Sequence, residues 1–338
     1  MRIQSRSVFI ALMLLFLLIT LALLDIRLGS VPITFSDMWK HLTGTLSLSD
    51  QQIIILVKFR LPRLATALLA GAALPLCGLQ MQTLFRNPLA GPYVLGISSG
   101  ASFGAALIVL GAGTAGLISA WGVALAAWAG AGMVMLLLLY VSFRIRDVMT
   151  ILILGIMFSS GLAAIISIMQ YFSEASALKS FIIWSMGSLG NVTGVQLRII
   201  SFSVIPLLVI SLFFAKPLNG LMLGEEYAVT MGLNIRRTRL MILAITSILA
   251  GTITAFCGPI GFIGIAVPHM TRFLIRRSDH RILLPLTMLT GMVILVMSDL
   301  ISQLPGSERV LPINAVTSLI GIPVVIWLVI LNRKAQAL

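Results

Sequence analysis

The strongest constraint on the fold of this chain is its succession of long apolar runs, which alternate with short intervals of charged and turn-forming residues. Hydrocarbon offers no hydrogen-bond partner to a backbone amide, so a run of about 20 apolar residues crosses a membrane as a helix. Hydrophobic residues make up 59% of the 338 residues and charged residues 10%, whereas soluble domains average about 25% charged. We therefore expect an all-α, polytopic membrane helix bundle that forms one domain over residues 1–338.

The apolar runs predict about ten transmembrane helices with both termini on the cytoplasmic side. Most lysine and arginine residues fall on the side of the termini, as the positive-inside rule requires. Two short surface helices are expected outside the bundle, one within residues 25–59 and an amphipathic one near residues 176–184. The predicted spans are residues 8–24, 61–84, 93–110, 117–143, 148–169, 197–215, 240–256, 260–275, 282–301 and 313–331.

Charge and cysteine content argue against a nucleic-acid-binding protein and against a protein held together by disulfides. The net charge of +13 does not indicate a nucleic-acid partner, because the basic residues lie between apolar runs without interleaved aromatic residues. Cys77 and Cys257 lie in or at the end of apolar runs, which favours buried free thiols over a disulfide.

The sequence does not contain the residue patterns expected of an ATP-binding site, a metal site or a catalytic site. No lysine follows a glycine, so a Walker A phosphate loop does not occur and any ATP must bind to another polypeptide. His41, His269 and His280 are too dispersed to predict a metal site. Asp299 is the only acidic residue clearly inside a predicted span, which counts against a stand-alone secondary carrier. The lack of a catalytic cluster counts against an intramembrane enzyme, and we expect no catalytic residue, cofactor or metal in this chain.

Small residues recur on two of the predicted spans. Gly96, Gly100 and Gly104 repeat every four residues on one helix face, and Gly155 and Gly161 interrupt the span at 148–169. Such spacing lets helix backbones pack closely, and it also suits a wide pathway lined by small residues. Both interpretations stay open at this point.

A stiff loop follows the span at 61–84. Pro88 and Pro92 remove amide donors and bias the preceding residues away from helix. Asn87 can cap the last carbonyl groups of the span or turn its side chain toward a pathway. The loop is therefore either a simple turn or a gate.

The longest cytoplasmic interval, residues 216–239, is amphipathic. It predicts two short helices that break at Gly224, with Glu225 and Glu226 opening the second helix, where acidic side chains suit the helix dipole. Such a pair is either a docking surface for a cytosolic partner or a surface connector. Its predicted apolar face comprises Leu218, Leu221, Met222, Tyr227, Val229 and Met231.

Two arginines, Arg60 and Arg63, lie at the outer mouth of the span at 61–84, against the usual charge bias. They can bind headgroups of the membrane lipid, or pair with carboxylates of an external protein through bidentate contacts. Composition alone favours headgroups slightly.

Six segments together form a specific pattern: RLPR at 60–63, GLQMQTLFRNPLAGPYVLGISSGA at 78–101, WSMGSL at 184–189, LGEEYAVTMGL at 223–233, GPIGFIGIAVPHMTR at 258–272 and DHRILLP at 279–285. In these segments the chain resembles the iron-siderophore, haem and cobalamin permeases of bacterial ATP-binding-cassette (ABC) importers, the FecCD-type family. The resemblance covers nearly the whole chain, with the segments in the expected order.

The resemblance implies a type II ABC importer permease in the bacterial cytoplasmic (inner) membrane. Its implied partners are a second permease subunit, expected to be an identical copy, two cytosolic ATPases that carry ATP and Mg²⁺, and an external substrate-binding protein. The implied cargo is a bulky metal chelate, a ferric siderophore first, then haem or cobalamin.

The resemblance also implies roles for particular residues. Docking of the binding protein falls to Arg60, Arg63 and Arg309, and the cytoplasmic gate to Asn87, Pro88 and Leu89. The pathway lining falls to Gly155, Met157, Ser159, Ser160 and Pro268. Coupling to the ATPase falls to Leu218, Leu221, Gly224, Glu225, Glu226, Ala228 and Gly232, within about residues 216–234.

The chain departs from the family pattern at the outer mouth. Gln303 stands where the family usually has an arginine, so one docking contact is lost or taken over by Arg309. The segment VLPIN at 310–314 lacks the carboxylate and the glycine of the Glu-Leu-Pro-x-Gly pattern. These departures concern the binding-protein interface and the ligand more than the fold.

Overall fold

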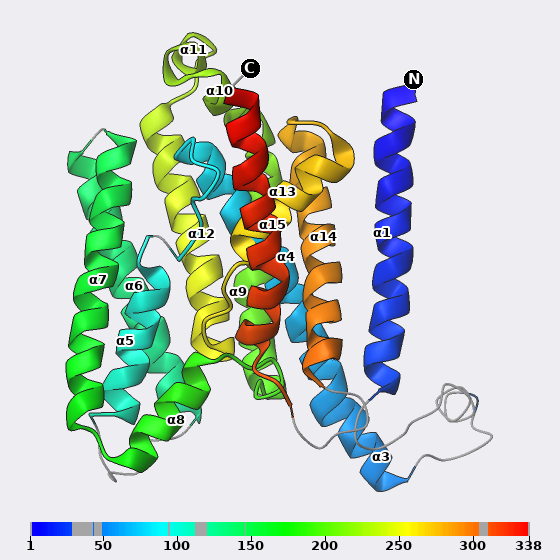
Figure 1. The fold of residues 1–338 in the computed structure, drawn as a ribbon, viewed down its shortest axis with the longest axis vertical. Helices are drawn as coiled ribbons and strands as arrows, with labels where there is room; N and C mark the ends of the chain where they lie inside the picture. The colour runs from blue at the N-terminus through cyan, green and yellow to red at the C-terminus, as the bar shows by residue number, and fades with distance from the viewer. Residues whose placement is uncertain are drawn as a thin grey trace.

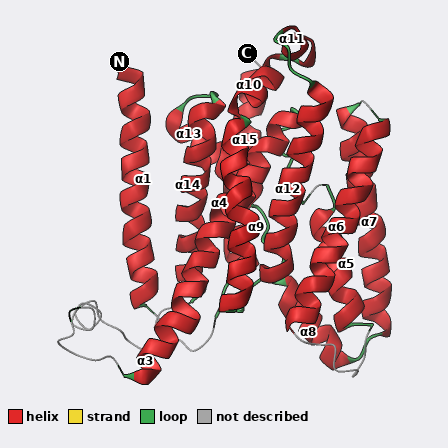
Figure 2. Ribbon diagram, turned by 180° about the vertical axis from the view of Figure 1, so that it is seen from behind, coloured by secondary structure: helices red, strands yellow, loops and turns green. Residues whose placement is uncertain are grey.

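The computed structural model describes residues 2–28, 43, 49–93, 95–111, 120–145, 147–303 and 310–336. All regular structure in these ranges is helical, and the long helices stand side by side in one bundle (Figures 1 and 2). Among the described residues, six helices are long and apolar enough to cross a membrane, and three shorter helices are apolar as well. Two residues named above, His41 and Arg309, lie outside the described residues.

Every predicted span contains a helix, and the all-α prediction is confirmed. The short helices expected outside the bundle are confirmed as well, as α3 and α8. The elements are α1 (Arg2–Arg27), α3 (Asp50–Ile55), the π-helix η1 (Leu56–Arg60), α4 (Leu61–Leu84), α5 (Ile97–Val109), α6 (Ala120–Arg144), α7 (Val148–Phe172), α8 (Ala175–Ser185), α9 (Gly194–Phe213), α10 (Ala215–Leu223), α11 (Glu225–Thr230), α12 (Ile235–Cys257), α13 (Ile263–Ile275), α14 (His280–Ser302) and α15 (Ile313–Gln336).

Several helix boundaries differ from the prediction by a few residues, and two of these differences change an interpretation. The first helix continues to Arg27, so Asp25 lies inside it and is buried, at 2% exposure. The statement that Asp299 is the only acidic residue within a span was therefore wrong. Helix α5 begins at Ile97 rather than at residue 93, because Pro92 and the left-handed Gly96 (φ 82°) delay its start. Its 13 residues extend only about 20 Å, less than the thickness of the hydrocarbon core.

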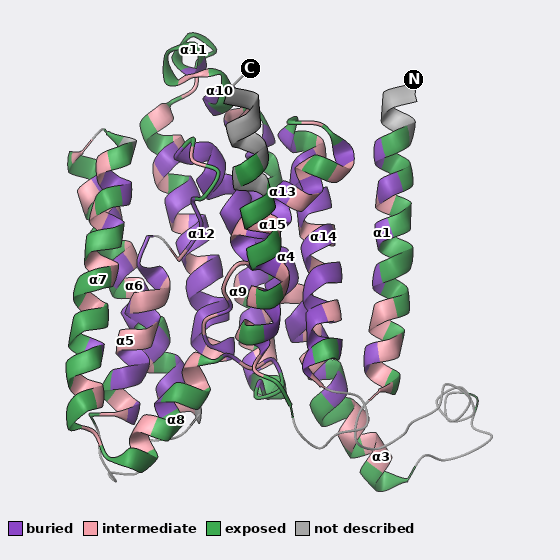
Figure 3. Cartoon of the chain, viewed as in Figure 1, coloured by how far each residue is buried: buried purple, intermediate pink, exposed green. Residues whose placement is uncertain are grey.

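Helix α4 is the centre of the bundle and is buried along most of its length (Figure 3). It crosses two neighbours at glycine pairs. A Cβ atom on Gly71 would lie 2.7 Å from the carbonyl oxygen of Gly291 in α14, and one on Gly78 would lie 1.6 Å from that of Gly264 in α13. Lipid tails are as apolar as leucine, so close backbone packing of this kind is what holds membrane helices together.

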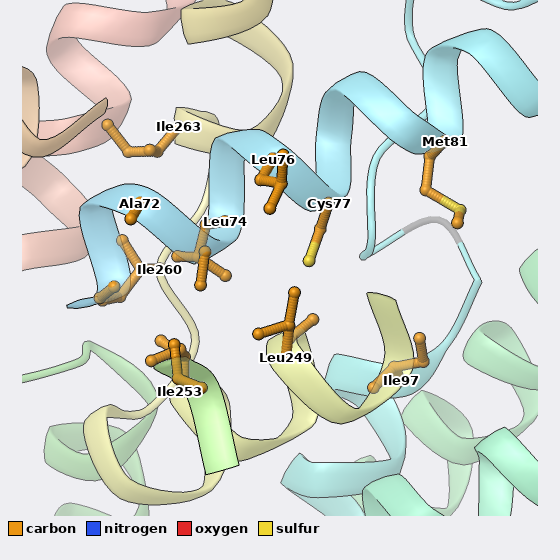
Figure 4. Packing of buried hydrophobic residues seen from close by; sticks show 14 of the residues in the cluster. Ala72, Leu74, Leu76, Cys77, Met81, Ile97, Leu249, Ile253, Ile260 and Ile263 are labelled. Atoms are coloured by element: carbon orange, nitrogen blue, oxygen red, sulfur yellow. The ribbon is translucent and has the colours of Figure 1, made fainter. Parts of the chain in front are cut away.

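Between the glycine crossings, α4 packs side chains against α12. Cys77 and Leu74 point toward Leu249 and Ile253 (Figure 4), and all four are fully buried. Cys77 and Cys257 are both buried free thiols, as predicted.

The two ends of the bundle differ. The helices α10 and α11 project at the end where both chain termini lie, while α3 and α8 lie at the opposite end (Figure 1). We call these the α10–α11 end and the α3–α8 end. Termini on one side agree with an even number of crossings.

Candidate transport pathway and its two ends

Two short helices form a projection at the α10–α11 end. The predicted break between them is confirmed, because Gly224 has a φ of 128°, which side chains disfavour. Glu225, at the start of α11, accepts a bond from Arg239 Nη2 at 2.9 Å. This ion pair ties the projection to the first turns of α12.

The single apolar face predicted for this projection was wrong, because the structure divides it. Leu218, Leu221 and Ala228 are buried and pack the two helices onto the bundle. Of the other residues expected to couple, Gly224 is half-buried, whereas Glu225, Glu226 and Gly232 are exposed. The outward apolar surface, which we call the knob, consists of Met222, Leu223, Tyr227, Val229 and Met231.

The proline loop after α4 lies beside α13. Asn87 Oδ1 accepts the backbone amide of Leu89 at 2.9 Å, so the side chain of Asn87 shapes its own loop. The carbonyl oxygen of Pro88 bonds His269 Nε2 of α13 at 2.8 Å. Pro88 and Leu89 themselves are exposed. The loop is thus held at its backbone, while the side chains of Pro88 and Leu89 face outward and that of Ala90 is buried.

A polar network connects the end of α4 to α10. His280, the first residue of α14, bonds Thr83 Oγ1 of α4 through Nε2 at 2.9 Å and Asn219 Oδ1 of α10 through Nδ1 at 2.7 Å. Close by, Arg86 donates to the carbonyl oxygen of Leu221 at 3.3 Å. The sequence analysis missed this network, because its members lie far apart in the chain and no spacing marks them.

Asn219 also fixes the start of α14. Its Nδ2 donates to Asp279 Oδ1 at 2.7 Å, and the same carboxylate accepts the backbone amide of Arg281 at 3.0 Å. The Arg281 amide and the Asn219 side chain hold the pKa of Asp279 below its ordinary value. Asp279 is therefore an ionised helix cap at neutral pH.

The residues expected to line a pathway are divided between the surface and the interior. Met157 and Ser160 are exposed on α7, and Ser159 is half-buried with its hydroxyl on the carbonyl oxygen of Gly155. Gly155 is packed, because a Cβ there would lie 3.0 Å from Leu95 Cα. Pro268 is buried within α13. Of the residues expected to line the pathway, Met157 and Ser160 are therefore the two whose side chains lie on the surface of the chain.

The glycine repeat of α5 is explained by helix packing. A Cβ on Gly104 would lie 1.9 Å from the carbonyl oxygen of Ala126, and one on Gly100 would lie 2.5 Å from that of Gly130. Both partners are on α6. The packing interpretation is therefore confirmed for these two glycines.

The two arginines predicted to lie at the outer mouth, Arg60 and Arg63, are held by their own chain. Arg60 is 8% exposed and donates to the carbonyl oxygen of Ile26 at 2.7 Å. Arg63 makes a bidentate pair with Asp299: Nε lies 2.8 Å from Oδ2 and Nη2 lies 2.8 Å from Oδ1. The Asp299 side chain is 1% exposed and the Arg63 side chain 18%. Helices α4 and α14 are thus fastened at the α3–α8 end.

Gln303 extends this fastening to α1. Its Nε2 donates to Asp25 Oδ1 at 2.7 Å and lies 3.1 Å from Asp299 Oδ2, so one amide serves two buried carboxylates. The residue that departs from the family pattern is therefore structural here. Arg63 and Asp299 also line a cavity of about 340 Å³, together with residues 186–189 and 310–313.

These features define a multi-pass helical membrane protein. The knob projects at one end, and the Arg63–Asp299 ion pair and the hydrogen bonds of Arg60 and Gln303 join helices at the other. Within the described ranges, no three His, Cys, Asp or Glu side chains lie close enough together to hold a metal ion. The chain matches the model of the FecCD transport family over residues 15–331, and it belongs to this family. It is a permease subunit of the ABC importer type.

Individual relatives match over most of their length. The chain is 34% identical to the hemin transport system permease protein HmuU of Yersinia pestis, over 96% of each chain. It is 38% identical to the vitamin B12 import system permease protein BtuC of Klebsiella pneumoniae, over 85% of each chain. A solved structure assigned to the metal-chelate type of ABC transporter, in an inward-facing conformation, superposes with a TM-score of 0.82 at 28% identity and covers 94% of this chain and 97% of its own.

Proposed function

We propose that this chain is one permease subunit of an ATP-driven importer that moves a bulky metal chelate into the cytoplasm. The observation that carries the proposal is the knob on α10 and α11, whose five apolar side chains stay exposed on a chain that matches the transport family nearly end to end. Exposed apolar clusters outside a membrane are typical of protein interfaces. We propose that the knob enters a cleft on a cytosolic ATPase and that the α10–α11 end faces the cytoplasm.

The polar network supports a route for the motion. An ATPase that pushes the knob also moves Asn219 on α10, and the bonds through His280 and Thr83 lead directly to the end of α4. The gate loop of Asn87, Pro88 and Leu89 begins at that end. We infer that ATP and Mg²⁺, bound by the ATPases, drive the gate through these contacts.

The proposed pathway runs between this chain and a second, identical copy, along the exposed face of α7 at Met157 and Ser160. This face offers few polar groups, which leaves selectivity to the external binding protein. The relatives named for hemin and vitamin B12 favour a metal chelate as cargo. A ferric siderophore, haem and cobalamin are the candidates.

Docking of the binding protein is proposed at the α3–α8 end, around Arg60, Arg63 and Arg309. The guanidinium groups of Arg60 and Arg63 contact their own chain, so docking through them requires these side chains to exchange partners. The cavity beside Arg63 leaves room for such an exchange.

The proposal is tested by reconstituting the chain in proteoliposomes with the ATPase and the binding protein proposed as its partners. Uptake of a ferric siderophore, hemin and cobalamin is measured with and without ATP. ATP-dependent uptake of one chelate is expected, and uptake without any ATPase would overturn the proposal.

Leu223→Glu with Val229→Glu in the knob should weaken ATPase association about tenfold or more, as expected for an interface centre. Val195→Glu, an exposed valine at the other end of the bundle, is the matched control and should leave association unchanged.

A further inference from the structure

A basic cavity at the α10–α11 end is not used by the proposed transport function. It has a volume of about 440 Å³ and lies between the end of α6 and the start of α12, beside α11. Its lining residues are Ser142, Phe143, Arg144, Ile145, Glu225, Ile235, Arg236 and Arg239.

The charges around the cavity favour an anion. Three arginines line it against one carboxylate, that of Glu225, which pairs with Arg239. Arg236 and Arg239 lie in the first turns of α12, where the helix dipole is positive and repels cations, so an anion there would relieve both charges. Asp147 lies nearby, but its carboxylate accepts the backbone amide and the hydroxyl of Thr150.

A buried hydroxyl, that of Ser142, lines the same cavity. Ser142 is 5% exposed, and its Oγ has no hydrogen-bond partner among the described residues. A buried donor without an acceptor is unfavourable. An oxygen-rich ligand in the cavity would satisfy it together with the guanidinium groups. A phosphate group offers both the charge and the acceptor oxygens.

An apolar groove on the outward side of α6 lies within one helical turn of the cavity, because the groove ends at Tyr140 and the cavity begins at Ser142. The groove has a volume of about 580 Å³ and is lined by Ala129, Gly132, Met133, Leu136, Leu137 and Tyr140. A Cβ on Gly132 would meet nothing within 4 Å, so packing does not require a glycine there. The Arg144 guanidinium lies 5.8 Å from the centre of the Tyr140 ring, which joins the groove to the cavity.

We propose that these two hollows form one binding site for an anionic phospholipid. The phosphate lies in the basic cavity among Arg144, Arg236 and Arg239, and one acyl chain lies in the groove over Gly132. The occupant is a lipid rather than a soluble anion, because the groove runs along a helix that is long and apolar enough to span the membrane. In addition, Arg144 of the cavity contacts Tyr140 of the groove. The site does not depend on which chelate the importer carries.

Native mass spectrometry of the full-length chain in detergent tests the site, by titration with phosphatidylglycerol and with phosphatidylcholine of the same acyl chains. Tighter binding of phosphatidylglycerol is expected. Arg236→Gln removes one arginine charge and should weaken the binding of phosphatidylglycerol about fivefold. Arg236→Lys keeps the charge and should retain most of the binding. Gly132→Leu, which fills the groove, should weaken both lipids. Arg198→Gln, an exposed arginine of α9 at the α3–α8 end, is the control and should bind as the unmodified chain does.

Three results would overturn the proposal. Equal binding of the two lipids by the unmodified chain would exclude a site for anionic headgroups. Unchanged phosphatidylglycerol binding in folded Arg236→Gln would place the lipid elsewhere. Displacement of the lipid by inorganic phosphate, with Gly132→Leu binding unchanged, would show that the cavity holds a soluble anion. Circular dichroism and gel filtration establish that each variant is folded.

Discussion

Removal of Arg63 should destabilise the bundle more than removal of the charge of its partner, Asp299. In Arg63→Gln, Asp299 loses its bidentate partner while its side chain is 1% exposed. Asp25, which is 2% exposed, shares the side-chain amide of Gln303 with Asp299. Within the described residues, the side-chain amide of Gln303 is then the remaining partner of the two buried carboxylates. Breaking a buried ion pair from one side costs about 3–5 kcal/mol of the free energy of unfolding. We expect about 3 kcal/mol, since the Arg63 side chain is 18% exposed and solvent screens part of the interaction.

In Asp299→Asn the charge that remains is that of the Arg63 guanidinium, which can reach water. Arg63 borders the cavity of about 340 Å³, so its guanidinium can be solvated there. The expected loss is about 1–2 kcal/mol, mainly of hydrogen bonds to a charged group. The double variant should lose less than the two single variants together, with a coupling of about 2 kcal/mol.

The assay is equilibrium unfolding of the full-length chain in mixed micelles of dodecyl maltoside and dodecyl sulfate. A coupling below about 0.5 kcal/mol, or a larger loss in Asp299→Asn than in Arg63→Gln, would refute the reasoning.

The same variants test docking of the binding protein, because Asp299→Asn releases the Arg63 guanidinium from its ion pair. If Arg63 contacts the binding protein, association should hold or tighten in Asp299→Asn and weaken in Arg63→Gln.

Two further predictions concern the bundle and one of its caps. Gly78→Val should lower the free energy of unfolding by about 3 kcal/mol or more, because even a Cβ atom would lie 1.6 Å from a carbonyl oxygen of α13; Gly132→Ala, with open space around it, should be neutral or slightly stabilising in the same assay. Asp279→Ala should cost about 1 kcal/mol at neutral pH through loss of the α14 cap. Because the folded-state pKa of Asp279 is lowered, its stabilisation is present above about pH 4 and disappears as the pH falls through the folded-state pKa. A loss that persists unchanged at pH 3 would contradict an ionised cap.

The local features of the fold were predictable because the membrane acts on each segment separately. Helix α4 runs from Leu61 to Leu84, the range expected from its apolar run, and α10 and α11 break at Gly224 as expected. Hydropathy determines where a segment must be helical, and a glycine or proline determines where the helix ends. Family membership also follows from the sequence, since the segments that carry it are contiguous.

The tertiary structure alone decided which side each residue faces and what it contacts. The apolar residues of 216–239 are alike in the sequence, yet Leu218 and Leu221 are buried while Leu223 and Val229 form the knob. Arg63 looked like a surface cation, yet it forms a partly buried pair with Asp299, a residue 236 positions away. Hydropathy selects segments for the membrane but is silent on pairing between them, because lipid solvates every apolar face equally. Backbone contacts such as Gly78 with Gly264, and hydrogen bonds between distant residues, therefore set the arrangement of the helices.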